Sequence, residues 1–509
     1  MDAMAQLAQA GAAAMAVEIA AKDKVCLKAE RDCRPEYCPY AKGFYDRLPG
    51  ALEEALGLAL LDRSAIAELS RRHSVCPFEL SLELAQLADV VVCDYNYVFD
   101  PFVSIQALLA APGGACLLVD EAHQLAPRVR DAYSAVMDTH ELRGLRRDTG
   151  KALGRRHALY KALTSAIRTL ETLADREDFA QLDAPPESLG TAMRDVQEAA
   201  AQALAQGGGK TAADGFSLAM AYLSAWERFD DRYALLAKAE QKHVRLELAL
   251  LDASAEILAQ TRRARGTVFF SATLAPFDAC RRMLGSEEGD ACLALASPFD
   301  PARLHVYVEP IDIRYRSREQ TAPHVAAAIL AYIRAHAGNT IAFFPSYAYM
   351  DRIAELMLGM EEMPDIPFMR ERRAMTEDEK NALLGAFEGD EQTVLLAVLG
   401  GAFSEGIDLP GKRLQNVIVV STGMPQPDER LRAMQAYYDA RGENGFDLTM
   451  TLPGMVRVIQ AAGRLIRTDT DSGTLLLIDS RYRHACIRAL LAGTLIGDAL
   501  QRQESADQA

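Results

Sequence analysis

The 509-residue chain is too long for one ordinary hydrophobic core, so we expect two or three domains. Half of the residues are apolar and 25% are charged, which excludes a disordered or fibrous protein. The formal net charge of −16 argues against coating nucleic acid by bulk attraction, although a local basic groove is compatible with it. Neither an 18-residue apolar run nor a secretory signal is present, so we expect a cytoplasmic protein that makes no membrane contact.

Short apolar runs bounded by polar or turn residues predict strands buried on both faces, as in a parallel sheet covered by helices. The runs are 89–93, 115–119, 267–270, 340–344, 393–399, 416–421 and 473–478. Three fall in the front half and four in the back half, so the expected fold class is α/β with two doubly wound domains. Between them, residues 128–265 carry Ala, Leu, Glu and Arg at helical spacing and predict a helical insertion. Residues 22–87 predict a second insertion, mostly helical from Ala51 onward.

The strongest single motif is an apolar strand that ends in two adjacent carboxylates, Asp120 and Glu121, followed by Ala122 and His123. The last side chains of a parallel strand project into the crevice where such folds bind nucleotides. Asp120 could hold Mg²⁺ through water, and Glu121 could orient or deprotonate the water that attacks a γ-phosphate. The plain alternative is a strand that ends in a charged turn. The four-residue box favours nucleotide chemistry.

A second cluster contains Gln460, Arg464 and Arg467, which recur every three to four residues. A helix would present them on one face as a cationic fork, which could neutralise charge on a transferred phosphoryl group. Taken alone, the cluster could equally be a solvated basic helix face. It follows a hydroxyl box at 271–274 and a Gly-rich box at 400–409, in which Asp408 could bond a ribose or a metal-bound water. The fixed order of the boxes favours the functional interpretation.

Four of the nine cysteines fall in one early segment, as Cys26, Cys33, Cys38 and Cys76. A disulfide framework is not expected, because the cytosol keeps thiols reduced. Three close thiolates and one distant thiolate could hold zinc or a [4Fe-4S] cluster, and the spacing differs from the paired Cys-x₂-Cys of most zinc ribbons. Buried structural thiols are the remaining alternative.

The chain resembles the XPD/DinG-like superfamily 2 iron-sulfur DNA helicases over nearly its whole length. The matching segments are 120–123, 271–274, 343–347, 404–408 and 460–467. The resemblance implies that Asp120 binds magnesium, that Glu121 is the catalytic base, and that His123 and Gln460 couple the nucleotide site to strand binding. The remaining candidate residues follow from the same resemblance. They are Arg464 and Arg467 as arginine fingers, Gly406, Asp408 and Gly463 as nucleotide-binding residues, and Cys26, Cys33, Cys38 and Cys76 as ligands of a [4Fe-4S] cluster.

The implied fold has two RecA-like parallel-sheet motor domains, the first incomplete, with a helical iron-sulfur insertion and a helical arch insertion. The expected boundaries are 1–21 (remnant of the first motor domain), 22–87 (iron-sulfur insertion), 88–127 (first motor domain), 128–265 (arch), 266–296 (end of the first motor domain) and 297–509 (second motor domain). The implied activity is ATP-dependent unwinding of DNA with 5′ to 3′ polarity, in repair or replication. The expected cofactors are ATP, Mg²⁺ and the cluster, and the expected partner of this monomeric motor is single-stranded or forked DNA.

The sequence departs from this family in one respect. It contains no Gly-x₄-Gly-Lys-Ser/Thr, the loop whose amides and lysine hold the β- and γ-phosphates. The run Gly209-Lys210-Thr211 has Leu204 where the first glycine is required, and we interpret it as a decoy. We therefore expect the chain as written to hydrolyse ATP poorly or not at all. Two alternatives stay open, a motor-dead iron-sulfur protein that grips single strands and a Cys₄ zinc protein with vestigial helicase boxes.

Two further expectations concern placement. We expect the acidic pair Asp120 and Glu121 to face Arg464 and Arg467 across an interdomain cleft. The aromatic run at 94–101, just past a strand end, could stack on bases or could belong to the core and a turn.

Overall fold

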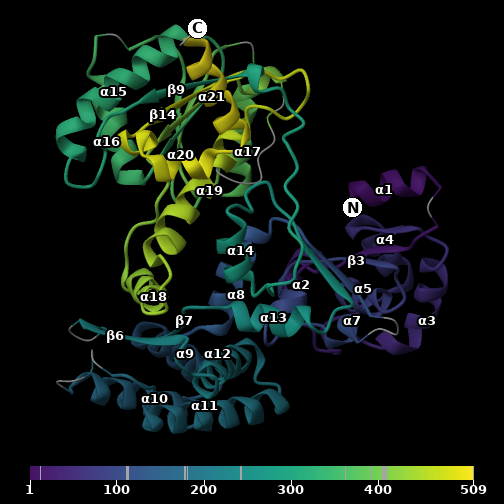
Figure 1. Ribbon diagram of the computed structural model, residues 1–509. Helices are drawn as coiled ribbons and strands as arrows, with labels where there is room; N and C mark the ends of the chain where they lie inside the picture. The colour runs from purple at the N-terminus through teal and green to yellow at the C-terminus, as the bar shows by residue number, and fades with distance from the viewer. Residues whose placement is uncertain are drawn as a thin grey trace. The chain divides into compact units, whose positions relative to one another are not determined.

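The computed structural model describes residues 1–11, 13–110, 114–176, 179, 182–240, 243–361, 363–389, 391–403, 409 and 411–507. The chain divides into two compact units (Figure 1). The first comprises Met1–Ala272 and Arg282–Ser286, and the second comprises Thr273–Arg281 and Glu287–Ala509. None of the helices in these described ranges is long and apolar enough to cross a membrane.

The first unit opens with a three-stranded parallel sheet in the order β2-β1-β3. Its strands are β1 (Ala16–Glu18), β2 (Leu60–Leu61) and β3 (Val90–Val92). Helices α3 (Phe44–Ala55), α4 (Arg63–His73) and α5 (Pro77–Ala85) share one apolar core with this sheet. Because β2 lies within residues 22–87, that segment supplies a strand to the sheet as well as helices.

A second, two-stranded parallel sheet pairs β4 (Cys116–Val119) with β8 (Gly266–Phe269). The expectation that all of the apolar runs are buried on both faces is wrong here. Leu118 is 72% exposed and Val268 is 54% exposed, because the helices of the described residues leave this face of the pair uncovered. Apolar composition predicts that a strand prefers burial, but burial also requires a neighbouring layer.

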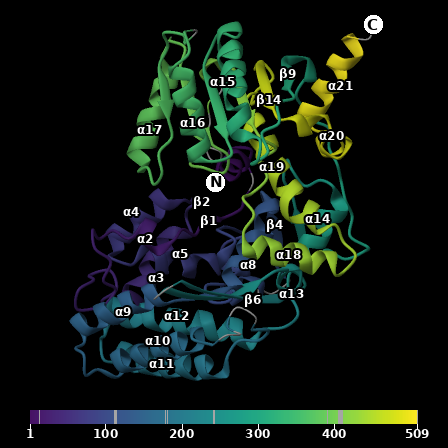
Figure 2. The ribbon, with the colours of Figure 1, turned by 90° about the vertical axis from the view of Figure 1, so that its left-hand side faces the viewer.

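The segment between β4 and β8 contains a four-helix layer and a three-stranded antiparallel sheet in the order β5-β7-β6. The strands are β5 (Ala135–Asp138), β6 (Tyr233–Glu240) and β7 (His243–Leu250). The helices are α9 (Thr139–Ala152), α10 (Ala158–Ala174), α11 (Glu187–Ala205) and α12 (Gly209–Glu227), and Figures 1 and 2 both show them beside the sheet. The expectation of an essentially helical insertion is therefore only partly correct.

Strand β7 lies in the segment that was expected to be helical, and its composition explains the wrong expectation. Its first four residues alternate between exposed polar and buried apolar side chains, with Arg245 exposed and Leu246 buried, whereas its last four residues are all buried. This period of two indicates a strand, but Ala, Leu, Glu and Arg also favour helices. Pairing with β5 and β6 over their full lengths decides the outcome.

The decoy run lies where the composition indicated. Lys210 and Thr211 lie in the first turn of α12, directly after the turn from α11.

Helix α10 buries one face against the rest of the insertion. Its residues Leu163, Ile167 and Leu170 are buried at helical spacing, which is the packing expected of an amphipathic helix in a bundle.

The second unit is built on a six-stranded parallel sheet in the order β11-β12-β10-β13-β14-β9. Its strands are β9 (Leu304–Glu309), β10 (Thr340–Phe344), β11 (Phe368–Arg370), β12 (Val394–Val398), β13 (Asn416–Val420) and β14 (Gly473–Ile478). The four strands expected from the apolar runs are present, and β10, β12 and β13 are buried at every position.

Helices cover both faces of this sheet (Figures 1 and 2). Helices α15 (Arg318–Ala335) and α16 (Tyr347–Leu358) pack against one face, on a core that includes Ala342 and Phe344. Helices α19 (Leu452–Ala462), α20 (Ala485–Leu491) and α21 (Leu495–Asp507) pack against the other face, on a core that includes Ile341 and Phe343. Successive residues of β10 point alternately into these two cores, so every residue of the strand is buried and the sequence of β10 is an unbroken apolar run.

The remaining helices and turns connect these layers. They are α1 (Asp2–Gln9), α2 (Lys22–Val25), α6 (Asn96–Phe99), α7 (Gln106–Leu109), η1 (Ala122–Gln124), α8 (Leu125–Tyr133), α13 (Ser254–Thr261), α14 (Phe277–Leu284), η3 (Pro301–Arg303), α17 (Glu377–Gly385), η4 (Ala386–Glu388), η5 (Gly411–Arg413), α18 (Glu429–Asp439), η6 (Asp447–Thr451) and η7 (Ser480–Arg483).

Candidate functional sites

The acidic box lies at the paired carboxyl ends of β4 and β8. Val119 is opposite Phe269 in the parallel register, and the N–H of Phe270 donates to the carbonyl of Val119 at 3.0 Å. The N–H of Ala122 in turn donates to the carbonyl of Phe270 at 3.2 Å. These two hydrogen bonds join the turn after β4 to the turn after β8, which brings the acidic box and the hydroxyl box together.

Three side chains from these two boxes form a hydrogen-bonded relay. The hydroxyl of Ser271 donates to Oε2 of Glu121 at 3.0 Å, and Nδ1 of His123 lies 2.9 Å from the same hydroxyl oxygen. A serine hydroxyl carries a single hydrogen, so His123 must hold its proton on Nδ1 and donate it to Ser271. Nδ1 of His123 also lies 3.3 Å from Oε2 of Glu121. Asp120 and Glu121 are both exposed, so a ligand can reach their carboxylates.

Tyr95, from the turn after β3, holds the backbone of the acidic box through hydrogen bonds. Its hydroxyl donates to the backbone carbonyl of Asp120 and to that of Glu121, the latter at 3.1 Å. Glu121 has a φ of 47°, in the left-handed region that a non-glycine residue rarely adopts, so its turn needs such support. Burial raises the pKa of Tyr95 to about 12, which keeps its hydroxyl protonated as a donor. Arg128 lies over the ring, 5.5 Å from its centroid.

The other aromatics of the 94–101 run belong to the core. Tyr97 is 7% exposed and Phe99 is 3% exposed, so neither ring is available for stacking on a base. Of the two interpretations of this run, the core-and-turn alternative holds for these residues. Tyr95 was not expected to contact the acidic box, and no pattern in the sequence indicated it.

The four early cysteines line one cavity in the first unit, with a volume of about 290 Å³. Lys22, Tyr45 and Phe78 are among its other lining residues. None of these four cysteines forms a disulfide. Cys26, Cys33 and Cys38 lie in a stretch of turns, and Cys76 is the residue preceding α5. The spacing in the sequence predicted a common site, and the fold places the four side chains around the same hollow.

Burial and the neighbouring polar groups act on the pKa of the Cys76 thiol in opposite directions, and burial has the larger effect. Burial raises the pKa of the Cys76 thiol, while the amides of Glu79 and Phe78 at the start of α5 and the Lys22 ammonium act in the opposite direction. Lys22 is paired with Glu79 at 2.8 Å and lies 5.0 Å from the centre of the Phe78 ring. Among the described residues, no three His, Cys, Asp or Glu side chains are grouped closely enough to hold a metal ion. The four thiols thus surround a space without converging on one point.

In the second unit, the carboxyl edge of the sheet carries the expected Phe-Phe-Pro-Ser-Tyr segment. Ser346 caps α16, its hydroxyl accepting from the N–H of Tyr349 at 3.3 Å. The hydroxyl of Tyr347 donates to Oε1 of Glu371 at 2.9 Å. Burial, together with this carboxylate, raises the pKa of Tyr347 to about 12.

Glu371 is a buried carboxylate that sequence reasoning missed. It is 2% exposed and accepts from the N–H of Val398 and from the N–H of Ala402, both at 2.8 Å. A Cβ on Gly401 would lie 2.5 Å from Oε1 of Glu371, so only glycine fits there. Glu371 therefore anchors the start of the Gly-rich box. The signal in the sequence was weak, an acidic residue that follows Phe368, Met369 and Arg370. Gly406, Asp408 and the rest of 404–408 lie outside the described residues.

The arginine cluster differs from its expected form. Helix α19 ends at Ala462, so Gln460 is helical whereas Gly463, Arg464 and Arg467 follow the helix. The expectation that one helix face presents all three polar side chains is therefore wrong. Arg464 is 6% exposed, and the exposed Arg467 has its backbone N–H bound to Oδ2 of Asp471 at 2.8 Å. The helix ends before the fork is complete, and Oδ2 of Asp471 accepts from the N–H groups of Arg467 and Thr468 in the turn that follows.

Asp120 and Glu121 belong to the first unit, and Arg464 and Arg467 belong to the second. Their expected approach across a cleft stays a prediction, as do the expected domain boundaries and the roles of the site residues.

Comparison with known proteins agrees with the parallel α/β units and the acidic box. A family described as DEAD_2 matches residues 9–142, and a family described as Helicase C-terminal domain matches residues 329–495. The matches include the cysteine segment and acidic box in the first case and most of the six-stranded sheet in the second. Fold and site thus define a superfamily 2 helicase-type protein.

Among curated relatives, the ATP-dependent helicase DinG of Mycobacterium tuberculosis is 28% identical over 467 residues, with 82% of this chain and 66% of the relative covered. The ATP-dependent DNA helicase YoaA of Escherichia coli is 28% identical over 238 residues, with 46% of this chain and 36% of the relative covered. A solved structure titled XPD_Helicase has a TM-score of 0.62 at 16% identity, over 94% of this chain and 85% of that one. The chain belongs to the DinG/XPD-like family of superfamily 2 helicases. It spans just under two thirds of the length of the DinG relative.

Proposed function

We propose that this chain acts on DNA as part of an ATP-dependent helicase, coupling nucleotide hydrolysis to movement along a single strand. The relay from His123 through Ser271 to Glu121 carries the proposal, because it joins the carboxylate that would activate water to a second strand end. Asp120 would hold Mg²⁺, and Glu121 would orient the attacking water. The family membership and the names of the relatives support this assignment.

The finer features of the proposal follow the family. We propose 5′ to 3′ polarity, a role in repair or replication, a monomeric motor in the cytoplasm, and single-stranded or forked DNA as the partner. In the second unit, Gln460 would couple the two activities, and Arg464 and Arg467 would contact the transferred phosphate. Gly406, Asp408 and Gly463 would contact the nucleotide.

We further propose that Cys26, Cys33, Cys38 and Cys76 hold a [4Fe-4S] cluster. Four free thiols around one 290 Å³ cavity suit a ligand broader than a single ion. When bound, the cluster would supply a rigid cross-link between the turns at 26–38 and the start of α5. Anaerobic purification tests this directly. A brown protein with iron and broad visible absorption is expected, whereas a colourless protein with zinc would overturn it.

Hydrolysis is tested with the 509-residue chain, alone and fused behind a strand, phosphate loop and helix from a curated relative. The chain alone is expected to hydrolyse ATP slowly, because its sequence contains no Gly-x₄-Gly-Lys-Ser/Thr. The fusion should show DNA-stimulated hydrolysis that Glu121→Gln abolishes while nucleotide binding remains. If the fusion binds ATP but never hydrolyses it, the enzyme proposal fails.

The missing phosphate loop also favours a second candidate, an iron-sulfur protein that grips single strands without turnover. Both candidates predict binding of single-stranded DNA by the 509-residue chain. Only the helicase predicts that ATP and Mg²⁺ alter this binding in the fusion, and that Glu121→Gln alters the response.

A further inference from the structure

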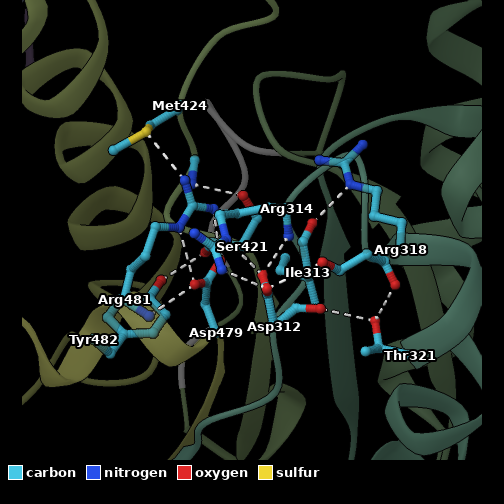
Figure 3. A network of polar contacts seen from close by, with 12 residues as sticks. Asp312, Ile313, Arg314, Arg318, Thr321, Ser421, Met424, Asp479, Arg481 and Tyr482 are labelled. Atoms are coloured by element: carbon cyan, nitrogen blue, oxygen red, sulfur yellow. Dashed lines mark hydrogen bonds and ion pairs between the residues drawn. The ribbon is translucent and has the colours of Figure 1, made fainter.

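A network of polar contacts joins three parallel strand ends in the second unit, apart from the acidic box, the cysteine cavity and the Gly-rich box (Figure 3). The N–H of Ser480, after β14, donates to the carbonyl of Ile311, after β9, at 3.0 Å. The hydroxyl of Tyr482 donates to the carbonyl of Ser421, after β13, at 2.6 Å. Since β13, β14 and β9 are parallel neighbours, the loop 310–318 lies at the carboxyl edge of the sheet, where such folds bind ligands.

Two aspartates in this network hold two guanidinium groups in the same geometry. Asp312 accepts from the backbone N–H of Arg314 at 3.0 Å and from its side chain at 2.9 and 2.6 Å. Asp479, which is fully buried, accepts from Arg481 at 2.9, 2.9 and 2.6 Å. Hydrogen bonds from Arg314 hold the pKa of Asp312 well below its usual value, so the pair is ionised at neutral pH. Each clamp fixes its guanidinium plane and leaves Nη1 pointing away from the carboxylate.

The loop 310–318 and the turn 479–484 carry more arginine than these aspartates can neutralise. They contain five arginines and two aspartates, so their local charge is five minus two, or +3, in a chain whose net charge is −16. In the part of the chain that the structure describes, Arg316, Arg318 and Arg483 form no ion pair with a carboxylate. Arg318 instead donates to the carbonyl of Ile313 at 2.9 Å. Glu309 and Glu319 flank the loop, and Glu319 is paired with Arg352 at 2.7 Å, so a smaller excess of positive charge remains at this edge.

Tyr315 lies between Arg314 and Arg316 in this loop and is 90% exposed. An aromatic ring so exposed gains nothing from the core of its own unit. A ligand that matches the loop must offer flat apolar surface and negative charge at short intervals. Single-stranded nucleic acid has both, since bases stack on aromatic rings while guanidinium groups contact the phosphates.

We infer that the 310–318 loop is a contact site for single-stranded DNA, with Tyr315 stacking on a base and Arg314 and Arg316 contacting the phosphates on either side. The clamp from Asp312 presents Nη1 of Arg314 in a fixed direction, so little side-chain freedom is lost on binding. This inference rests on the proposed DNA-dependent function and locates part of its track in the second unit.

Fluorescence provides the sharpest test, because the chain has a single tryptophan, Trp226, in α12 of the first unit. In Tyr315→Trp the new indole should be quenched by an oligothymidine, in proportion to binding measured by anisotropy. Tyr307→Trp is the matched control. Tyr307 is 43% exposed on β9 and lies against Tyr332 and His336, so an indole at that position should not respond.

Two truncations separate stacking from charge. Tyr315→Ala should weaken binding of oligothymidine at least about fivefold at fixed salt, the loss expected for one stacked base. Arg316→Ala should reduce the slope of log affinity against log salt by about 0.7, the value for one phosphate contact on a single strand. Arg372→Ala, which removes an exposed arginine paired with Glu379 elsewhere in the unit, should leave the slope unchanged.

The outcomes distinguish this inference from the proposed function. If the unaltered chain binds oligothymidine but Tyr315→Trp is not quenched and Tyr315→Ala binds normally, the loop is not part of the track and the inference fails alone. If the unaltered chain does not bind oligothymidine, the proposed function and the inference fail together. Equal quenching by polyglutamate would identify the loop as a contact for acidic protein and would also overturn the inference.

Discussion

The side chains of His123 and Ser271 meet although they are 148 residues apart in the sequence, with Nδ1 2.9 Å from Oγ. The same hydroxyl is bound to Glu121, so a change at the carboxylate alters the hydrogen bonding of the histidine. A relay of this kind is suited to linking events at a nucleotide to events elsewhere in the unit.

Replacing Ser271 with Ala should separate hydrolysis from its stimulation by DNA. The change removes the hydroxyl that lies between His123 and the carboxylate of Glu121, a loss of about 1 kcal/mol or somewhat more. In the fusion that carries a phosphate loop, we expect stimulation by DNA to fall roughly tenfold, while Mg²⁺-ATP binding is retained. Ser271→Thr, which keeps the hydroxyl, should behave almost normally. Equal stimulation in the Ala and Thr variants would show that the relay does not couple these events.

Removing the hydroxyl of Tyr95 should loosen the acidic box. Tyr95→Phe loses the donor to the carbonyls of Asp120 and Glu121, and we expect the free energy of unfolding to fall by about 1 kcal/mol. Tyr97→Phe is the control, because in the described residues the hydroxyl of Tyr97 makes no hydrogen bond. Urea denaturation of both variants checks the difference, and equal stability would remove the supporting role assigned to Tyr95.

Neutralising the buried carboxylate of Glu371 should destabilise the second unit. A glutamine there would turn an NH₂ group toward donors that need an acceptor, at a cost of about 1 to 3 kcal/mol. Glu377→Gln, on a side chain that is 81% exposed, is the matched control and should be nearly neutral. Hydrogen exchange at the amides of Val398 and Ala402 provides a local measurement. Unchanged protection there in Glu371→Gln would contradict the anchoring role.

Loss of one cavity thiol should bleach the protein, whereas loss of an unrelated thiol should not. Cys38→Ser removes a proposed cluster ligand, so visible absorption and bound iron should both fall and the residues around 26–43 should become protease-sensitive. Cys93→Ser changes a thiol of the same unit that does not line the cavity, and it should retain colour and iron. Iron loss in both variants, or in neither, would argue against the four-cysteine assignment.

The ion pair between Asp252 and Arg282 gives the first unit a stability that depends on pH. Burial acts to raise the pKa of Asp252, but the hydrogen bond from Arg282 at 2.8 Å and the amide of Ser254 outweigh it, so the pKa lies below its usual value. A carboxyl whose folded pKa is depressed stabilises the fold above its unfolded pKa and loses that contribution as the pH falls through the folded value. We therefore expect Asp252→Asn to lower the melting temperature at pH 7 and to have little further effect at the lowest pH at which the chain stays folded. An equal penalty at both values would indicate a packing effect instead of an ionic one.

Elements with a local signal could be predicted from the amino-acid sequence. Buried strands such as β10, β12 and β13 appear as unbroken apolar runs, because both of their faces meet helices. The acidic box, the hydroxyl box and the cysteine quartet could also be recognised in the sequence, since each needs particular side chains at fixed spacing. The order of the boxes indicated the family.

Features that depend on distant neighbours could not be predicted before the fold was known. β7 is a strand because β5 and β6 pair with it, although its composition also suits a helix, and Leu118 is exposed because no layer of the described residues covers it. Arg464 and Arg467 lie beyond the end of α19, and Asp471 binds the backbone N–H of Arg467. Tyr95 and Glu371 acquire their roles from backbone groups far along the chain, and a hydrogen bond of that kind leaves no periodic trace in a sequence.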